Sequence, residues 1–366
     1  RWFDCIVGNP PYTRQEEIED LSGEGYKEDL IQKALNETGA NISKRAGIHA
    51  YFFVHGTKFL RDGGIFGFIV SNSWLDVDYG KGLQEFFLKN YKIIAIIESK
   101  VERWFEDADI NTCIVILEKC SDKKEREENY VRFVQLKKKM RYFIPMAESM
   151  WEKEIKRLEE IEKLRKLILG HKEYYENEEL KIYPVKQIDL WNEGFNTREG
   201  YVGAKWGKYI RAPQIFFKII EKGKYLFVTL KEVAEVRRGF TTGANEFFYL
   251  TEEDIKKWAI EKEFWMHKEG GKLVPNYVIK SPRECKGIIV KPEDLKFRVL
   301  MIHKSRKELK GTNVLKYIEW GEEQGFDKRP TCASRERWWD LGEARTSKIA
   351  WVKSVNVVHI THYSEV

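Results

Sequence analysis

Short apolar runs alternate with amphipathic segments along the first third of the chain. The apolar runs lie at residues 3–8, 65–70, 93–97 and 112–117. Continuous apolar runs of this kind are typical of strands buried on both faces, and helical patterns at 48–61 and 80–90 separate them. The pattern therefore predicts an α/β domain whose parallel sheet is covered on both faces by helices.

Two glycines follow the first of these helical patterns. Gly63 and Gly64 stand directly before the apolar run at 65–70. Glycine often occupies the position just beyond a helix, because it adopts the left-handed conformation without strain. We therefore expect this pair to end the helix and to lead into the strand.

Residues 121–184 differ in character from the alternating part. A charge run at 122–128 precedes a short strand-like run at 131–134. Beyond Trp151 the apolar residues recur every three or four positions, at Ile155, Leu158, Ile161, Leu164 and Ile168. This period is that of an amphipathic helix, which fits either a surface helix packed on its own domain or a spacer or short coiled-coil arm.

The last part of the chain is rich in aromatic residues and short strand-like runs. A helix is expected from Trp206 to about residue 222, and strands are expected at 349–352 and 355–360. These changes of pattern predict three parts. They are an α/β domain at residues 1–140, a helical spacer at 141–184 and an α+β domain at 185–366.

The composition is compatible with two domains and an anionic partner. Of the 366 residues, 42% are hydrophobic, and the formal net charge is +6. Charged residues of both signs make up 33% of the chain, so the basic excess fits an anionic partner without defining one.

Cysteine and histidine positions give no indication of a metal site. The cysteines, at 5, 113, 120, 285 and 332, form no Cys-x2-Cys pair, and the histidines show no ligand spacing. We expect Cys5 and Cys113 to be buried, because both lie in strand-like runs. No apolar run reaches the ~18 residues of a membrane helix, and no signal peptide is present, so a cytoplasmic location is expected.

The tetrapeptide Asn9-Pro10-Pro11-Tyr12 carries the most specific chemistry of the chain. It follows the apolar run at 3–8, and its prolines fix φ and lack a backbone N–H, so the turn is rigid and leaves carbonyls without local partners. Asn9 Oδ1 and the Pro10 carbonyl can then accept both hydrogens of an incoming NH2 group. The Tyr12 ring would lie beside that group as a stacking face. Two such acceptors would make the amine nitrogen a better nucleophile.

This tetrapeptide resembles the catalytic motif of amino-methyltransferases that use S-adenosyl-L-methionine. The resemblance is closest to N6-adenine DNA methyltransferases of the Eco57I/TaqI type, where the motif is (Asn/Asp/Ser)-Pro-Pro-(Tyr/Phe). Residues 63–71 and 109–112 resemble later motifs of the same family. The resemblance implies the later half of a Rossmann-like methyltransferase sheet, with catalytic roles for Asn9, Pro10, Pro11 and Tyr12.

The resemblance also implies a cofactor and a target. S-Adenosyl-L-methionine would supply the methyl group, with Asn9 beside it. The family carries its main cofactor loop ahead of the tetrapeptide, so we expect that segment, and any nuclease domain, to precede residue 1. The target base has to leave double-stranded DNA. Tyr12 would stack on one face of this base. Phe105 would stack on the other face, unless it is an ordinary apolar residue of a loop.

The most informative segment of the last part runs from Val228 to Leu250. Within it two glycines bracket an aromatic residue and two threonines, and two arginines precede them. The segment resembles target-recognition domains of these methyltransferases and of type I specificity subunits. This likeness predicts DNA-binding roles for Arg237, Arg238, Thr241, Thr242, Asn245, Arg335 and Arg337.

These features favour a site-specific, adenine-specific DNA methyltransferase of a restriction-modification system. A glutamine or RNA amino-methyltransferase shares the tetrapeptide, and an N4-cytosine acceptor also fits it. A DNA-specificity subunit without catalysis is the alternative from another class, although the intact tetrapeptide argues against it.

Overall fold

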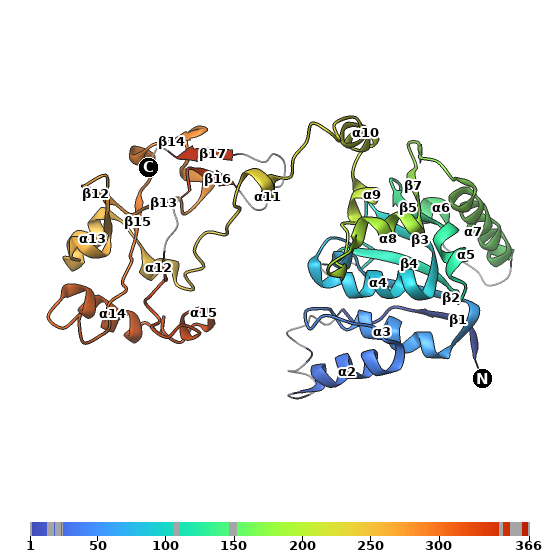
Figure 1. Ribbon diagram of the computed structural model, residues 1–366, viewed down its shortest axis with the longest axis horizontal. Coiled ribbons are helices and arrows are strands. Elements are labelled where there is room, and N and C mark those ends of the chain that lie inside the picture. The colour runs from blue at the N-terminus through green and yellow to red at the C-terminus, as the bar shows by residue number, and fades with distance from the viewer. Residues whose placement is uncertain are drawn as a thin grey trace. The chain divides into compact units, whose positions relative to one another are not determined.

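The computed structural model describes residues 2–12, 18, 23, 25–105, 110–145, 152–343, 347–351 and 361–364. The chain divides into two compact units, Arg1–Phe227 and Val228–Val366 (Figure 1). The first is an α/β unit built on one large sheet, and the second is an α+β unit with several small sheets. Among the described residues, no helix is long and apolar enough to cross a membrane.

A seven-stranded sheet forms the centre of the first unit, in the order β1-β2-β4-β3-β5-β7-β6. Its strands are β1 (Phe3–Gly8), β2 (Leu60–Ser71), β3 (Tyr91–Ser99), β4 (Thr112–Lys119), β5 (Tyr130–Leu136), β6 (Tyr175–Glu176) and β7 (Leu180–Lys186). A separate two-stranded ribbon joins β8 (Phe195–Asn196) to β9 (Gly200–Tyr201).

The large sheet is mixed, so the expectation of a purely parallel sheet is wrong. Only the pairs β1/β2 and β3/β5 are parallel, whereas β4 runs antiparallel to both β2 and β3. The residues that the structure describes between β3 and β4 form no helix. Without a crossover helix the chain returns from the edge at which β3 ended, and the next strand must run antiparallel.

Helices cover both faces of this sheet. They are α2 (Tyr26–Thr38), α3 (His49–Gly56), α4 (Lys81–Asn90), α5 (Lys123–Glu128), α6 (Met140–Phe143), α7 (Glu152–Gly170), α8 (Gln187–Gly194), α9 (Gly207–Arg211) and α10 (Gln214–Lys222). On β3, Ile93 and Ile96 join the core cluster that contains Phe53 of α3, whereas Ala95 and Ile97 join the cluster on the other face. The predicted two-faced α/β core is confirmed.

Gly63 and Gly64 lie inside β2, so the prediction that they end a helix is wrong. Helix α3 already ends at Gly56, and a 3-10 turn, η1 (Thr57–Phe59), connects it to the strand. The pairing of β1 with β2 shifts register at this point, because Phe3 pairs with Leu60 but Cys5 with Ile65. Gly63 has φ +71°, and a Cβ at Gly64 would lie 2.8 Å from the Leu60 side chain. The pair therefore forms a bulge that only glycine fits.

The segment expected as a spacer belongs to the first unit, which ends at Phe227 rather than near residue 140. Strands β6 and β7 complete the sheet, and α7 packs on β5. Ile168 is 5% exposed, whereas Ile155 at the other end of α7 is 66% exposed. Helix α7 is therefore a surface helix packed on its own domain, the first of the two alternatives. The sequence left both open because helical periodicity does not reveal what the apolar stripe contacts.

Proline interrupts the helix expected from Trp206 to about 222. Helix α9 ends at Arg211, Ala212 is extended, and α10 begins at Gln214 after Pro213. A proline restricts the residue before it to extended conformations and lacks the N–H that a continuing helix needs. One predicted helix is therefore two.

The second unit combines short strands with helices around an aromatic core. Its strands are β10 (Tyr249–Leu250), β11 (Met266–Glu269), β12 (Lys272–Pro275), β13 (Tyr277–Val278), β14 (Ile289–Val290), β15 (Phe297–Val299), β16 (Ile349–Trp351) and β17 (Thr361–Ser364). Its helices are α11 (Leu230–Val233), α12 (Asn245–Phe248), α13 (Glu252–Trp258), α14 (Asn313–Glu323) and α15 (Pro330–Ala333). Phe247 stacks on Tyr317 at a centroid distance of 4.7 Å. Strand β16 matches the expected strand at 349–352, and the one at 355–360 lies outside the described residues.

Five further 3-10 turns complete the secondary structure of the described residues. They are η2 (Ser73–Leu75), η3 (Asp78–Gly80), η4 (Lys262–Phe264), η5 (Pro282–Glu284) and η6 (Pro292–Asp294).

Candidate functional site

Polar residues gather at one edge of the large sheet, where β1, β2 and β3 end and β4 begins. Because β1 and β2 are parallel, Asn9 follows the end of β1 on the side where Ser71 ends β2. Ser71 in turn pairs with Thr112, the first residue of β4. Carboxyl ends of strands are the usual place for ligands in α/β sheets. This edge is therefore the first place to look for chemistry.

The tetrapeptide leaves β1 at a point of close packing. A Cβ on Gly8 would lie 2.9 Å from Phe68 Cε1, so only glycine fits there. Pro10 is then buried, while Asn9 and Pro11 are exposed. Within the described residues no hydrogen bond uses the Pro10 carbonyl oxygen or the side-chain Nδ2 of Asn9. The segment thus presents polar groups with unused hydrogen-bonding capacity at the sheet edge.

Tyr12 folds back onto Asn9. Its hydroxyl donates a hydrogen bond to Asn9 Oδ1 at 2.6 Å and lies 3.4 Å from the carbonyl oxygen of Ile69 in β2. Burial raises the pKa of the Tyr12 hydroxyl to about 12, and Cys113 contributes in the same direction. The hydroxyl therefore stays protonated at ordinary pH and acts as a donor.

Phe105, the second predicted stacking residue, lies beside Tyr12. The two ring centroids are 5.6 Å apart, and the planes are inclined by 56°. Phe105 belongs to the loop between β3 and β4. Because β4 runs antiparallel to β3, this loop lies at the end of the sheet where the tetrapeptide leaves β1. The structure thus brings Asn9, Tyr12 and Phe105 together from two segments.

An ion pair between a buried carboxylate and a partly exposed arginine lies at the same edge and is not predicted by the sequence. Glu98 is 5% exposed at the end of β3. It accepts hydrogen bonds from Asn72 Nδ2 at 3.0 Å and from Arg211 Nε at 3.0 Å. Arg211 also pairs with Asp76. The sequence signal was a lone acidic residue that ends an apolar run, but its cationic partner lies far along the chain.

A small polar cavity of about 210 Å³ adjoins this ion pair. It is lined by Asn72, Glu98, Ser99, Lys100, Glu102, Arg103, Asn111, Thr112, Gln135 and Arg211. Among the described residues, no group of three or more His, Cys, Asp or Glu side chains could hold a metal ion.

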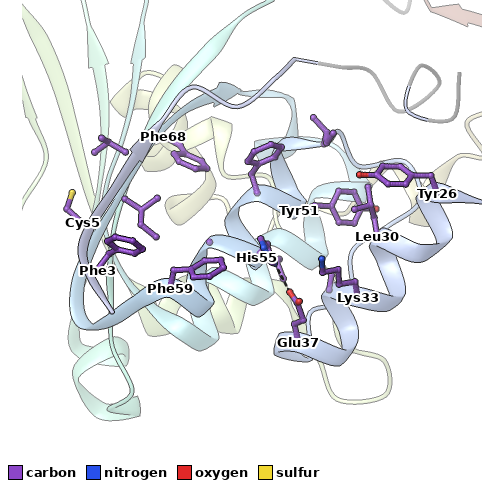
Figure 2. Close-up of a pocket in the computed structure, with 17 residues that line it drawn as sticks. Phe3, Cys5, Tyr26, Leu30, Lys33, Glu37, Tyr51, His55, Phe59 and Phe68 are labelled. Carbon is purple, nitrogen blue, oxygen red and sulfur yellow. Dashed lines mark hydrogen bonds and ion pairs between the residues drawn. The ribbon is translucent and has the colours of Figure 1, made fainter. Parts of the chain in front are cut away.

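A larger, apolar groove of about 650 Å³ lies along β1, α2 and α3 (Figure 2). Figure 2 shows Phe3 on the side of the strand that faces Phe59, whereas Cys5 points to the opposite side; the His55–Glu37 contact of 2.9 Å lies on the helical side. Cys5 is exposed, so the expectation that it is buried is wrong, whereas Cys113 is buried as expected. Cys5 is exposed because its side chain points away from α2 and α3, to a side of β1 that no described element covers.

In the second unit the predicted recognition residues differ in exposure: Thr242 is buried, two are half-buried (Arg335 and Arg337), and the others are exposed. Arg237 pairs with Glu235, with Nε 2.6 Å from Oε1, and Arg238 and Thr241 are exposed. Thr242 is only 3% exposed, and its hydroxyl hydrogen-bonds to the side chain of Asn245. The exposed residues are accessible to a ligand, whereas Thr242 shapes the loop from inside.

The two distant arginines have different surroundings. Arg337 pairs with Asp340 at 2.7 Å. Arg335 donates to the carbonyl oxygens of Thr241 and Thr242 at 2.5 and 3.0 Å. The structure thus places Arg335 against the loop that the sequence singled out, although the two are far apart along the chain.

Comparisons with known proteins find similarity in two segments of the chain. Residues 1–105 match the family model of the Eco57I restriction-modification methylase, and residues 204–359 match that of the type II methyltransferase M.Eco57I, C-terminal domain. Type II methyltransferase M.BstVI of Geobacillus stearothermophilus is 35% identical over 105 residues, 29% of this chain and 17% of the relative. M.AccI of Acinetobacter calcoaceticus is 21% identical over 363 residues, 97% of this chain and 55% of the relative.

The solved structure of the type IIG restriction endonuclease BpuSI is also similar. It is 14% identical, covers 94% of this chain and 36% of its own, and gives a TM-score of 0.44. The chain spans about half the length of M.AccI and a smaller share of M.BstVI.

Proposed function

We propose, because residues 1–105 and 204–359 match models of Eco57I-type methylases, that this chain methylates the N6 amine of an adenine within a specific DNA sequence. The observation that carries the proposal is the convergence of Asn9, Tyr12 and Phe105 at the edge of the sheet. The second unit supplies sequence recognition. The alternatives with the same tetrapeptide gain no separate support from the site.

The acceptors of the tetrapeptide suit a neutral amine. Asn9 Oδ1 and the Pro10 carbonyl would accept the two amine hydrogens and favour a tetrahedral nitrogen. The nitrogen becomes tetrahedral and positively charged only as the methyl group arrives, so these hydrogen bonds strengthen in the transition state. No side chain with a strongly basic function is needed, because the proton can leave after the transfer.

S-Adenosyl-L-methionine is the proposed methyl donor, and it supplies a methyl group already activated on a sulfonium. The groups at this edge fit such a cation by their chemistry. Asn9 offers a neutral carbonyl oxygen, and Tyr12 and Phe105 offer aromatic rings, both of which are compatible with a positively charged neighbour. Asn9 is the residue of this chain that would lie against it.

Capture of the base requires a rearrangement of the two rings. A base sandwiched between them needs the rings about 7 Å apart, twice the ~3.5 Å of an optimal carbon contact. Their present separation of 5.6 Å is shorter, and the rings are tilted. Tyr12 would therefore turn away from Phe105 when a flipped base enters, and stacking would compensate for part of the unpairing energy.

The test is detection of the modified base. The full-length gene would be expressed in a host that lacks its own adenine and cytosine methylation, with the Asn9→Ala variant as the control. Mass spectrometry of the digested DNA should reveal N6-methyladenine, and modified-base sequencing should place it in one sequence context. The variant should give at most a trace.

Other outcomes would contradict the proposal in distinct ways. N4-methylcytosine in place of N6-methyladenine would change the acceptor. Methylation of RNA or of a glutamine side chain, with unmodified DNA, would support an alternative amino-methyltransferase. Sequence-specific DNA binding without any methyl transfer would indicate a specificity subunit.

A further inference from the structure

Two arginines hold three consecutive carbonyls of one loop in the second unit. Arg335 donates to the carbonyl oxygens of Thr241 at 2.5 Å and Thr242 at 3.0 Å. Arg329 lies 3.3 Å from the carbonyl oxygen of Gly243, which follows directly. These carbonyls therefore face the arginines and not the surrounding solvent.

The opposite side of the same peptide groups carries donors. In a planar trans peptide the N–H points away from the preceding C=O, and the described chain contains no cis peptide bond. The N–H groups of Thr242, Gly243 and Ala244 therefore point away from the arginines that bind the preceding carbonyls. Thr242 and Ala244 are 3% and 0% exposed, so their N–H groups point into the protein and are not open to a ligand. The exposed side chains of Thr241 and Asn245 are the groups that the loop presents outward.

Both arginines are held in place by other contacts. Arg335 also donates to the Trp338 carbonyl at 3.1 Å, and its guanidinium lies 5.6 Å from the centre of the Phe248 ring. Arg329 pairs with Glu246 at 3.0 Å. Arg335 thus uses its donors inside the protein, which leaves it poorly suited to bind a phosphate directly.

The loop packs closely against α15 at Gly243. Gly243 has φ +77°, which side chains rarely adopt, and a Cβ there would lie 2.9 Å from both Cys332 Sγ and Thr331 Cβ. The loop backbone therefore lies directly on α15. Any side chain at this position would lift the loop from the helix.

We propose that Arg335 and Arg329 are positioning residues that fix the recognition loop Thr241–Asn245, so that the exposed side chains of Thr241 and Asn245 face DNA. The inference rests on the proposed function. It changes the role of Arg335 from a DNA contact to a support of the residues that make contact. Sequence discrimination would then depend on a residue that does not touch the duplex.

Substitution by lysine separates the two roles. Lysine keeps the charge but lacks the planar fork that donates to two carbonyls at once. As a positioning residue, Arg335→Lys should lose about as much discrimination among target variants as Arg335→Ala, roughly 10-fold or more. The matched control is the exposed Arg238, where a phosphate contact would tolerate lysine and lose about one unit of salt slope on replacement by alanine.

The measurement is the affinity of the full-length protein for unmodified DNA at two salt concentrations. The DNA carries either the sequence that the protein methylates or a single-base variant of that sequence. We expect both Arg335 variants to bind all sequences more alike, with the wild-type salt slope. Gly243→Ala should have the same effect without any change of charge. Thermal unfolding of each variant would verify that the second unit is folded.

Three results would overturn the inference. Wild-type discrimination in Arg335→Lys, together with a smaller salt slope in Arg335→Ala, would make Arg335 a phosphate contact. Full discrimination in a folded Gly243→Ala variant would show that the packing of the loop on α15 does not affect sequence discrimination. Absence of sequence-dependent binding by the wild type would contradict the proposed function itself, and the inference would fall with it.

Discussion

The Tyr12 hydroxyl donates a hydrogen bond of 2.6 Å to Asn9 Oδ1, the oxygen that the proposed reaction needs as an acceptor. A carbonyl oxygen has two lone pairs, so this bond occupies one and leaves one for an amine hydrogen. The hydroxyl also determines which way the Asn9 amide points. Tyr12 therefore prepares the acceptor as well as offering a ring.

Replacement of Asn9 tests the acceptor. Asn9→Ala should lower the methylation rate by roughly 10²–10³-fold, the usual cost of removing one group that stabilises a transition state. DNA affinity should change little, and Asn9→Asp, which keeps an acceptor oxygen, should be less damaging. Single-turnover methylation with saturating DNA measures the effect. A rate for Asn9→Ala within about threefold of the wild type would refute the role given to Asn9.

Two substitutions of Tyr12 separate its ring from its hydroxyl. Tyr12→Phe removes only the bond to Asn9, worth about 1 kcal/mol, so the rate should fall roughly fivefold. Tyr12→Ala also removes stacking and should cost a further ~1–3 kcal/mol in base capture. Fluorescence of an adenine analogue at the target position reports the capture step. Equal capture by the wild type and Tyr12→Ala would exclude stacking.

The pairing of buried Glu98 with the partly exposed Arg211 should contribute to the stability of the catalytic edge. Arg211→Met leaves the buried Glu98 carboxylate with Asn72 as its remaining partner, and should destabilise the first unit by about 1–3 kcal/mol. The exposed pair Arg61–Asp4 is a matched control, where Arg61→Met should cost less than ~1 kcal/mol. Urea unfolding measures both. Similar losses for the two variants would show that burial of Glu98 carries no special cost.

His49 should make the stability of the first unit depend on pH. Its side chain is buried on α3, and burial lowers its pKa from 6.5 to about 4. The unfolded chain therefore binds a proton more readily, so stability is full above pH 6.5 and declines as the pH falls toward 4. Near pH 5 the expected loss is about 2 kcal/mol.

The comparison of wild type with His49→Leu isolates this contribution from that of the carboxylates. The difference in unfolding free energy between neutral and acidic pH should shrink in the variant. An identical pH dependence in both proteins would mean that His49 titrates normally in the folded state.

The local part of the site was predictable from the sequence, and its supports were not. An apolar run that ends in two prolines fixes both a strand and a rigid turn within a few residues, so Asn9 and Tyr12 could be placed together. The approach of Phe105 depended on the motif resemblance. The contacts of Glu98 with Arg211 and of Arg335 with Thr241 join residues about a hundred positions apart, and no pattern along the chain encodes them.

The errors in the predicted fold have a common physical origin. Hydrophobic periodicity identifies an element and the face that it buries, but not the direction of a strand or the partner of a helix. The antiparallel course of β4 and the packing of α7 on the sheet were therefore open. The glycine bulge in β2 was read as a helix end, because both uses of glycine exploit the same conformational freedom.

The apolar groove along β1 has a practical consequence for handling the protein. Within the described residues β1 pairs on one edge only, and Phe3 and Val7 are 58% and 75% exposed. An unpaired strand edge can pair with a strand of another molecule, and exposed apolar surface favours aggregation. A preparation of residues 1–366 alone should therefore self-associate and bind hydrophobic dyes, and Val7→Lys should reduce both.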